Sequence, residues 1–308
     1  MSYAKSREWE KIQEYLPIKN RMKVDMEPQE YFISIQNTEV HIDHYKVDRP
    51  RGRVIMFHGV GGNGRLLSFM AIPLMKCGFE VICPDLPLYG YTKYRGVVTY
   101  DMWVSCGVEI VNYFQREKRD TFLLGLSAGG MLAYQIAALC PEITGVMATC
   151  ILDQRNRIIT KQTAVNPVMA VVGNAILSMT HRVIGSWKIP MKMIANMKAI
   201  TNNQDLADIL MKDKRSSGTR VSLAFVYSML NPLLETEPEN FTKCPFLLVH
   251  PEDDRWTDVE LSRLFFDRLA CEKELQILEG AGHFPIESKG LEQMQRYCVA
   301  FMEKCLTE

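Results

Sequence analysis

The chain has 308 residues, 47% of them apolar, and its 36 basic and 36 acidic side chains leave no net charge at pH 7. A chain of this length and composition forms either one large domain with an insertion or two small domains, each with a sizeable core. The balanced charge excludes a single-sign field that would attract nucleic acid or an anionic membrane surface, so we expect no nucleic-acid partner.

The cysteines and the apolar stretches bear on location. The nine cysteines are an odd number without C-x-x-C spacing, which is typical of reduced, mostly buried thiols in a cytosolic protein. The first ten residues are polar and lack the apolar core of a signal peptide. The longest apolar stretch, 164–179, is interrupted by Asn166, Pro167, Gly173 and Asn174, so we expect no transmembrane segment. These features predict a cytoplasmic protein.

The first half of the chain predicts a sheet. Residues 31–36 and 40–47 alternate apolar and polar side chains, which predicts an antiparallel hairpin at the sheet edge. From residue 53 onward, strands and helices alternate, which predicts a parallel sheet covered by helices on both faces. The predicted strands lie at 53–57, 79–83, 121–124 and 145–150, and the predicted helices at 66–76, 99–118 and 128–139. Ligands of such sheets bind beyond the carboxyl ends of the strands.

The alternation stops after Asp153 and resumes with a strand at 246–250, a helix at 258–269 and a strand at 274–278. The intervening segment is helix-like and rich in methionine, with Met169, Met179, Met191, Met193, Met197, Met211 and Met229. Methionine side chains are pliable and suit adaptable apolar surfaces. The segment therefore either lines a pocket for an apolar group or fills a small core of its own.

Residues 125–129, Gly-Leu-Ser-Ala-Gly, lie between a predicted strand and a predicted helix. This is the setting of a nucleophile elbow, in which a sharp turn holds the serine in a strained conformation. Glycines at 125 and 129 remove the clashes that larger side chains would make in that turn. The N-terminus of the following helix favours negative charge nearby. We therefore expect Ser127 to attack carbonyl carbons.

A serine hydroxyl needs a histidine to accept its proton and a carboxylate to orient that histidine. In elbow enzymes these partners follow the serine, the carboxylate first and the histidine second. His283 fits the second position, because it lies in a glycine-rich loop after the last predicted strand. The candidates for the carboxylate are Glu252, Asp253 and Asp254 in one loop, and Asp153 after an earlier strand.

Residues 58–64, His-Gly-Val-Gly-Gly-Asn-Gly, follow the predicted strand at 53–57. Such a loop can aim a backbone N–H at the oxyanion of a tetrahedral intermediate, and the residue after the nucleophile supplies a second N–H. We assign Val60 and Ala128 to these roles. We expect His58 to hold the loop by hydrogen bonds rather than to act as a base.

His41, Asp43 and His44 are close enough in sequence to suggest a metal site. On a strand, however, His41 and Asp43 share one face and His44 points to the other. We expect no metal, and the serine chemistry requires no organic cofactor.

Four motifs occur in an order and spacing that resemble the α/β-hydrolase superfamily, and together they cover nearly the whole chain. They are the HGxG-like loop at 58–61, GLSAG at 125–129, the acidic loop at 251–254 and GAGH at 280–283. Within the superfamily the chain is similar to capped esterases and monoacylglycerol-lipase-like enzymes. The family spacing favours Asp254 as the carboxylate, although Pro251 stands where the family usually has glycine.

The resemblance implies an α/β-hydrolase core of residues 1–152 and 241–308, with a helical cap of residues 153–240 inserted after the sixth strand. It also implies a serine hydrolase that cleaves a carboxylic ester of a small, largely apolar acyl substrate through an acyl-enzyme. A lactonase, including an acylhomoserine-lactone hydrolase, and a non-catalytic ligand-binding member of the fold remain alternatives. An apolar cap also permits a homodimer.

Overall fold

The computed structural model describes residues 2–307 and contains one nine-stranded sheet. The strands are hydrogen-bonded in the order β1-β2-β4-β3-β6-β7-β10-β11, and β5 pairs with β2. Their bounds are β1 Gln29–Ile35, β2 Thr38–Tyr45, β3 Arg53–Phe57, β4 Glu80–Pro84, β5 Lys93–Tyr94, β6 Thr121–Gly125, β7 Gly145–Ala148, β10 Phe246–Pro251 and β11 Lys273–Leu278. The strands from β4 to β11 along this path are parallel, whereas β1 and β5 are antiparallel to β2.

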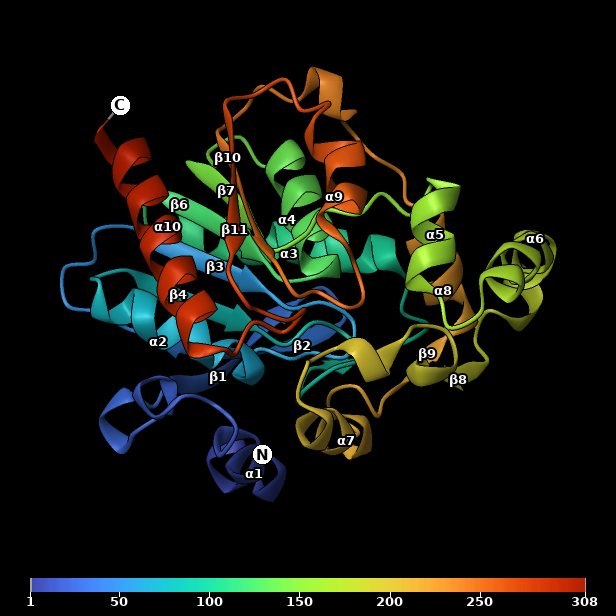
Figure 1. The fold of residues 1–308 in the computed structure, drawn as a ribbon, viewed down its shortest axis with the longest axis horizontal. Coiled ribbons are helices and arrows are strands. Elements are labelled where there is room, and N and C mark those ends of the chain that lie inside the picture. Colours follow the sequence, from blue (N-terminus) through green and yellow to red (C-terminus); the bar gives the residue numbers. More distant parts are fainter. Residues whose placement is uncertain (1, 308) are drawn as a thin grey trace.

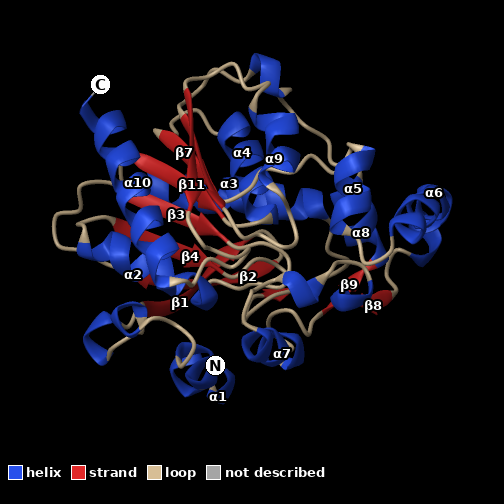
Figure 2. Cartoon of the chain, viewed as in Figure 1, coloured by secondary structure: helices blue, strands red, loops and turns tan. Residues whose placement is uncertain are grey.

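Helices cover both faces of the sheet (Figure 1), and Figure 2 shows the strands as a single layer between them. On one face lie α2 (Ser68–Lys76) and α10 (Ser288–Thr307), which contact each other. On the other face lie α3 (Tyr100–Gln115), α4 (Ala128–Leu139) and α9 (Val259–Phe266). Strands β3, β4, β6, β7 and β10 are buried along their whole length, as apolar strands covered on both faces must be. The predicted parallel sheet between two helical layers is confirmed.

Local sequence signals set several of the element boundaries. Strand β3 and helix α4 have the predicted bounds. Helix α3 begins after Thr99, whose side chain accepts a hydrogen bond from the Met102 N–H at 3.2 Å, as an N-cap residue does. The hairpin of β1 and β2 is confirmed, with β1 at the sheet edge.

The chain between β7 and β10 forms a group of elements outside the main sheet. We use the name cap segment for residues 153–240. Its helices are α5 (Arg157–Thr163), α6 (Pro167–Ile184), α7 (Gln204–Lys212) and α8 (Leu223–Leu230), and its strands β8 (Lys188–Pro190) and β9 (Arg220–Ser222) form a small antiparallel sheet. Elements α5, α6, α8, β8 and β9 lie at the right of Figure 1, and α7 lies below the sheet. The division of the chain into two domains at these boundaries stays a prediction.

The apolar stretch at 164–179 contains the polar and helix-disfavouring residues expected from the sequence, and α6 begins within it at Pro167. Asn166 caps the helix and Pro167 occupies its first turn, where both residues favour a helix start. Gly173 and Asn174 lower helix propensity without ending the helix. No residue of α6 is buried, and α6 is the one helix within residues 2–307 that is long and apolar enough to cross a membrane by length and composition. A single such helix is weak evidence for a membrane span.

Candidate active site

Ser127 lies at the sharp turn between β6 and α4, with φ +55° and ψ −128°. A positive φ is costly for a residue with a side chain, and such strain is typical of functional turns. The flanking glycines make the turn sterically feasible. A Cβ on Gly125 would lie 2.0 Å from the Gly129 carbonyl oxygen, and one on Gly129 would lie 2.2 Å from the Phe57 carbonyl oxygen. The turn thus presents the Ser127 hydroxyl beyond the carboxyl end of the sheet.

A chain of two hydrogen bonds links Ser127, His283 and Asp254. His283 Nε2 lies 2.8 Å from Ser127 Oγ, and His283 Nδ1 lies 2.8 Å from Asp254 Oδ2. Asp254 follows β10 and His283 follows β11, two adjacent parallel strands. A ring that donates its Nδ1–H to the carboxylate keeps the Nε2 lone pair free for the serine proton. This arrangement can generate a serine nucleophile.

Asp254 is held as a carboxylate by its surroundings. Its Oδ1 accepts hydrogen bonds from the N–H groups of Trp256 and Thr257, each at 2.8 Å, and its Oδ2 accepts one from the Thr257 hydroxyl at 2.7 Å. Burial alone would raise the pKa of the carboxyl. The charge and hydrogen bond of His283, together with the two bonds from Thr257, outweigh burial and lower the pKa of Asp254 to about 2.

The rival carboxylates have other positions. Glu252 is exposed and accepts a hydrogen bond from the Gly280 N–H at 2.9 Å, and Asp253 is exposed. Asp153 pairs with Arg155 at 2.7 Å. Within residues 2–307, Asp254 is the only carboxylate that pairs with His283.

Two site residues escaped the sequence prediction. The hydroxyl of Thr257 lies 3.2 Å from His283 Nδ1, in addition to its bond with Asp254. The ring of Trp256 lies against the His283 ring, with centroids 4.8 Å apart, and its Nε1–H donates to the Thr163 carbonyl oxygen in the cap segment at 3.0 Å. An aspartate followed two and three residues later by N–H donors is a known turn pattern, which was the available signal in Asp254-Arg-Trp-Thr257.

The loop of residues 58–64, called the oxyanion loop below, packs against the elbow. A Cβ on Gly59 would lie 2.8 Å from both the Leu126 carbonyl oxygen and the Ser127 Cβ, and 3.0 Å from the Ala128 nitrogen. Val60, the next residue, lines the same cavity as Ser127 and Ala128. Ala128 is the first residue of α4, and N–H groups at a helix start have no intrahelical acceptor. The structure therefore places both residues at the cavity that Ser127 lines, and the role of their N–H groups as oxyanion donors stays a prediction.

His58 joins the oxyanion loop to the chain after β4. Its Nδ1 lies 2.8 Å from the Gly59 carbonyl oxygen, and its Nε2 accepts a hydrogen bond from the Leu86 N–H at 3.0 Å. Complete burial lowers the pKa of His58 to about 4, so the ring is neutral at pH 7. These contacts suit a ring that holds the loop and do not suit a base.

A cavity of about 440 Å³ opens from the nucleophile into the cap segment. Ser127, Val60 and Ala128 lie at one end, and most of the remaining lining side chains are apolar. Four methionines of the cap segment contribute to it, namely Met169, Met191, Met193 and Met229. Met197 is buried without lining the cavity, and Met179 is exposed, so only some of these methionines line the cavity. The size and lining match those of small-molecule sites.

A model of the family described as Hydrolase_4, serine aminopeptidase S33, matches residues 48–287. The chain belongs to this family. The match confirms the predicted hydrolase class and, with the sheet order and helical layers, the α/β-hydrolase fold.

Known proteins similar to this chain include a thermostable monoacylglycerol lipase from Bacillus sp. (strain H-257), 30% identical over 105 residues. That stretch is 33% of this chain and 41% of the lipase, so the chain covers less than half of this relative. Among solved structures, a soluble variant of monoglyceride lipase from Saccharomyces cerevisiae, in complex with a substrate analogue, has a TM-score of 0.77 at 18% identity, covering 94% of this chain and 98% of the other. The N-acyl homoserine lactonase AidH, complexed with N-butanoyl homoserine, has a TM-score of 0.64 at 18% identity, covering 90% and 97%.

Proposed function

We propose that the protein is a serine hydrolase that cleaves the carboxylic ester of a small, largely apolar acyl substrate. One observation carries this proposal: the hydrogen-bonded chain from Asp254 through His283 to Ser127 ends at an apolar cavity of about 440 Å³. An apolar acyl group bound in this cavity would lie beside the groups that attack its carbonyl carbon, which supports the proposal.

In the first half of the reaction, Ser127 Oγ attacks the ester carbonyl carbon as its proton passes to His283 Nε2. Asp254 stabilises the imidazolium that forms and stays ionised. The carbonyl oxygen becomes an oxyanion, which accepts hydrogen bonds from the Val60 and Ala128 N–H groups. His283 then protonates the leaving alkoxide oxygen, the ester C–O bond breaks, and the acyl group remains on Ser127.

The second half repeats these roles with water. His283 accepts a proton from water while the water oxygen attacks the acyl carbon, and the same two N–H groups bind the second oxyanion. Collapse of this intermediate returns the proton to Ser127 Oγ and releases the carboxylic acid. Each step uses only side chains and backbone groups already described.

A lactone is the second candidate substrate class, because ring opening of a lactone is the same attack on an ester carbonyl. The apolar cavity beside Ser127 and the structural similarity to an N-acyl homoserine lactonase support keeping it. The two classes differ in the leaving group, which stays attached to the acyl chain in a lactone. A non-catalytic binder is disfavoured by the intact hydrogen-bonded chain at Ser127.

The first test is labelling with a fluorophosphonate probe, mapped by peptide mass spectrometry. Wild type should be labelled on Ser127, and Ser127→Ala should not be labelled. Ser105→Ala, which changes an exposed serine on α3, is the matched control and should label as wild type does. Absence of a label on folded wild type would refute an activated serine and favour the non-catalytic binder.

The second test compares p-nitrophenyl esters of increasing acyl length, monoacylglycerols and acylated lactones with the same three proteins. Ester turnover that Ser127→Ala abolishes supports the proposal. Lactone opening with a larger kcat/KM than any ester would replace it with the lactonase. Labelling of Ser127 without turnover of any ester or lactone would show that the substrate does not carry one of the acyl groups tested.

Three further predictions about the whole protein remain proposals. We propose that residues 1–152 and 241–308 form the hydrolase core and 153–240 its cap, which limited proteolysis tests by the position of the first cuts. We also propose a cytoplasmic location, tested by fractionation, and a homodimer, tested by light scattering in solution.

A further inference from the structure

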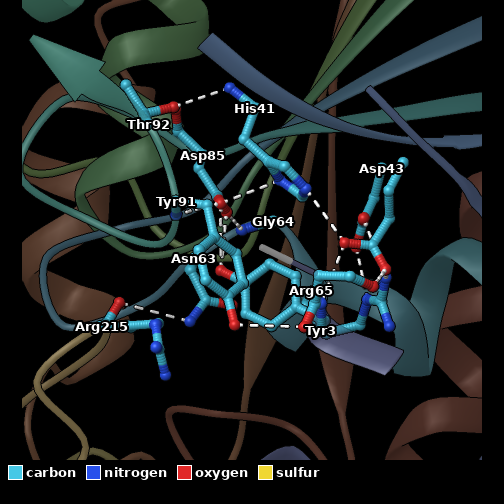
Figure 3. A network of polar contacts seen from close by, with 12 residues as sticks. Tyr3, His41, Asp43, Asn63, Gly64, Arg65, Asp85, Tyr91, Thr92 and Arg215 are labelled. Carbon is cyan, nitrogen blue, oxygen red and sulfur yellow. Dashed lines mark hydrogen bonds and ion pairs between the residues drawn. The ribbon is translucent and has the colours of Figure 1, made fainter. Parts of the chain in front are cut away.

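A buried polar cluster joins the start of the chain to the end of the oxyanion loop (Figure 3). Tyr3 belongs to a 3-10 helix, Tyr3–Lys5, in the N-terminal segment, which we define as residues 2–28. Its side chain is 3% exposed, and its hydroxyl donates to the two carboxylate oxygens of Asp85 at 3.1 and 3.0 Å. Its backbone N–H donates to Glu30 on β1 at 2.9 Å. Tyr3 therefore fixes the segment at two points.

Asp85 is fully buried and contacts four partners. Its Oδ1 accepts a hydrogen bond from the Gly64 N–H at 2.7 Å, and its Oδ2 accepts one from the Tyr91 N–H at 2.8 Å. His41 Nδ1 forms an ion pair with Oδ2 at 3.0 Å, and the Tyr3 hydroxyl is the fourth partner. A buried carboxylate requires donors of this kind, and Tyr3 supplies the one that comes from the N-terminal segment.

The same cluster contains the metal-like group suggested by the sequence, but its donors are already paired. Glu30, His41 and Asp43 place ligand atoms within 4.8 Å of one another. The Arg65 guanidinium binds Asp43 at 3.0 Å and Glu30 at 2.9 Å. Burial alone would lower the pKa of His41, but Asp85 and Glu30 face its two nitrogens and raise the pKa to about 9. The ligand atoms of this group are thus paired with one another, with Asp85 and with Arg65, which suits a structural cluster.

The oxyanion loop is held at both ends and in the middle. At the first residue of the loop, the His58 ring bonds to the Gly59 carbonyl oxygen and to the Leu86 N–H. At the last residue, the Gly64 N–H donates to the Asp85 carboxylate. In the middle, the hydroxyl of Ser217 in the cap segment donates to the Gly61 carbonyl oxygen at 3.0 Å. Gly64 is closely packed, since a Cβ there would lie 2.4 Å from the Cys83 carbonyl oxygen. Val60 lies between these anchors, so the direction of its N–H depends on them.

We propose that Tyr3 is a positioning residue for the oxyanion hole, acting through the bond from its hydroxyl to Asp85 and from Asp85 to Gly64. This inference rests on the proposed function, because it assigns the loop to oxyanion binding. Tyr3 does not line the cavity, so it affects the direction of the Val60 N–H only through Asp85 and the loop.

Loss of the Tyr3 hydroxyl should weaken binding of the transition state rather than binding of the substrate. A misdirected oxyanion donor weakens an interaction that is made only after the nucleophile attacks, so kcat falls and KM changes little. Removal of a whole oxyanion donor lowers kcat about 10²- to 10³-fold. Tyr3→Phe leaves Asp85 with its other three partners, so we expect kcat to fall about 5- to 20-fold and KM to stay within about twofold.

The test compares Tyr3→Phe with Tyr91→Phe in the full chain, with kcat, KM and the melting temperature measured for each. The Tyr91 hydroxyl donates to the Ser2 carbonyl oxygen at 3.2 Å, so the control removes a hydroxyl that holds the N-terminal segment without touching Asp85. The inhibition constant of an alkyl trifluoromethyl ketone, whose adduct with serine carries an oxyanion, is the specific readout. It should rise in Tyr3→Phe by the same factor as kcat/KM falls, and stay within about twofold of wild type in Tyr91→Phe.

The outcomes separate the inference from the function. An active wild type with Tyr3→Phe within twofold in kcat, or with an equal loss in Tyr91→Phe, overturns the inference and leaves the hydrolase intact. A wild type without esterase or lactonase turnover overturns both. If Tyr3→Phe does not fold, Asp85→Asn is tested in its place. A fall in kcat larger than the roughly 5- to 20-fold fall expected for Tyr3→Phe, with unchanged KM, supports the inference, and full activity of Asp85→Asn overturns it.

Discussion

Replacing Asp254 by asparagine tests the orientation of His283 without changing the shape of the site. The Asp254 Oδ1 atom accepts two backbone N–H bonds at 2.8 Å, so the asparagine oxygen is expected to take that position. The amide NH₂ then faces His283 Nδ1, which Oδ2 contacts at 2.8 Å in wild type. An NH₂ group can only donate, so Nδ1 must become the acceptor and the ring proton must move to Nε2. Nε2 can then no longer accept the proton of Ser127.

The expected loss follows from that tautomer change. The same substitution in a serine-histidine-aspartate site lowers kcat about 10⁴-fold, which corresponds to about 5 kcal/mol of activation free energy. We expect Asp254→Asn to lose about 10⁴-fold in kcat on the best p-nitrophenyl ester, with KM within about threefold of wild type. Steady-state turnover over a range of ester concentrations measures kcat and KM, and stopped-flow kinetics measures the rate of the acylation step.

Asp253→Asn is the matched control, because it makes the same chemical change on the exposed neighbouring residue. It should keep kcat within about twofold of wild type, because surface substitutions away from a site have small effects. If Asp254→Asn retained more than a tenth of the wild-type kcat, or if Asp253→Asn lost as much, the assignment of Asp254 would be wrong.

Three further predictions follow from burial, packing and cavity shape. Because the pKa of Asp254 falls from 3.8 to about 2 on folding, wild type should lose about 2 kcal/mol of unfolding free energy as the pH falls from about 4 to 2, and acid titration of Asp254→Asn should lack that loss. Gly129→Ala should lower the unfolding free energy by about 3 kcal/mol in urea titrations, because the new Cβ would meet the Phe57 carbonyl oxygen. Gly173→Ala has open space around its Cβ and should raise the unfolding free energy by up to about 1 kcal/mol in the same titrations. Met229→Trp, at the cavity wall, should shift the kcat/KM maximum to shorter acyl chains, and an unchanged chain-length profile would place the acyl group elsewhere.

Features set by short stretches of sequence were predictable. The β-α alternation places β3 and α4 at their observed bounds, because a buried strand and a capped helix each show their periodicity within a few residues. The elbow was predictable because its five residues form a known local motif, and Gly125 is required by a clash within that motif, with the Gly129 carbonyl oxygen. The meeting of Ser127, Asp254 and His283 followed from the rule that parallel strands end at one edge of the sheet.

Features set by pairing across the chain were not predictable. Tyr3 and Asp85 are separated by 82 positions, and neither has a local pattern that points to the other. The contact of the Thr257 hydroxyl with His283 exists because β10 and β11 bring Asp254 and His283 together, so the local turn pattern at Asp254 does not reveal it.

The cap segment leaves the sheet at β7 and returns at β10, and these two strands are hydrogen-bonded neighbours, with Val146 opposite Phe246. The excursion therefore begins and ends at nearly the same place, and no strand register depends on its length. The entropy of closing such an excursion grows only with the logarithm of its length, by about 0.6 kcal/mol for each doubling. Insertions, deletions and exchanges between β7 and β10 can thus remodel the cavity beside Ser127 while the serine, the histidine and the aspartate stay in place. In this architecture, substrate range and bond-breaking chemistry can evolve at different rates.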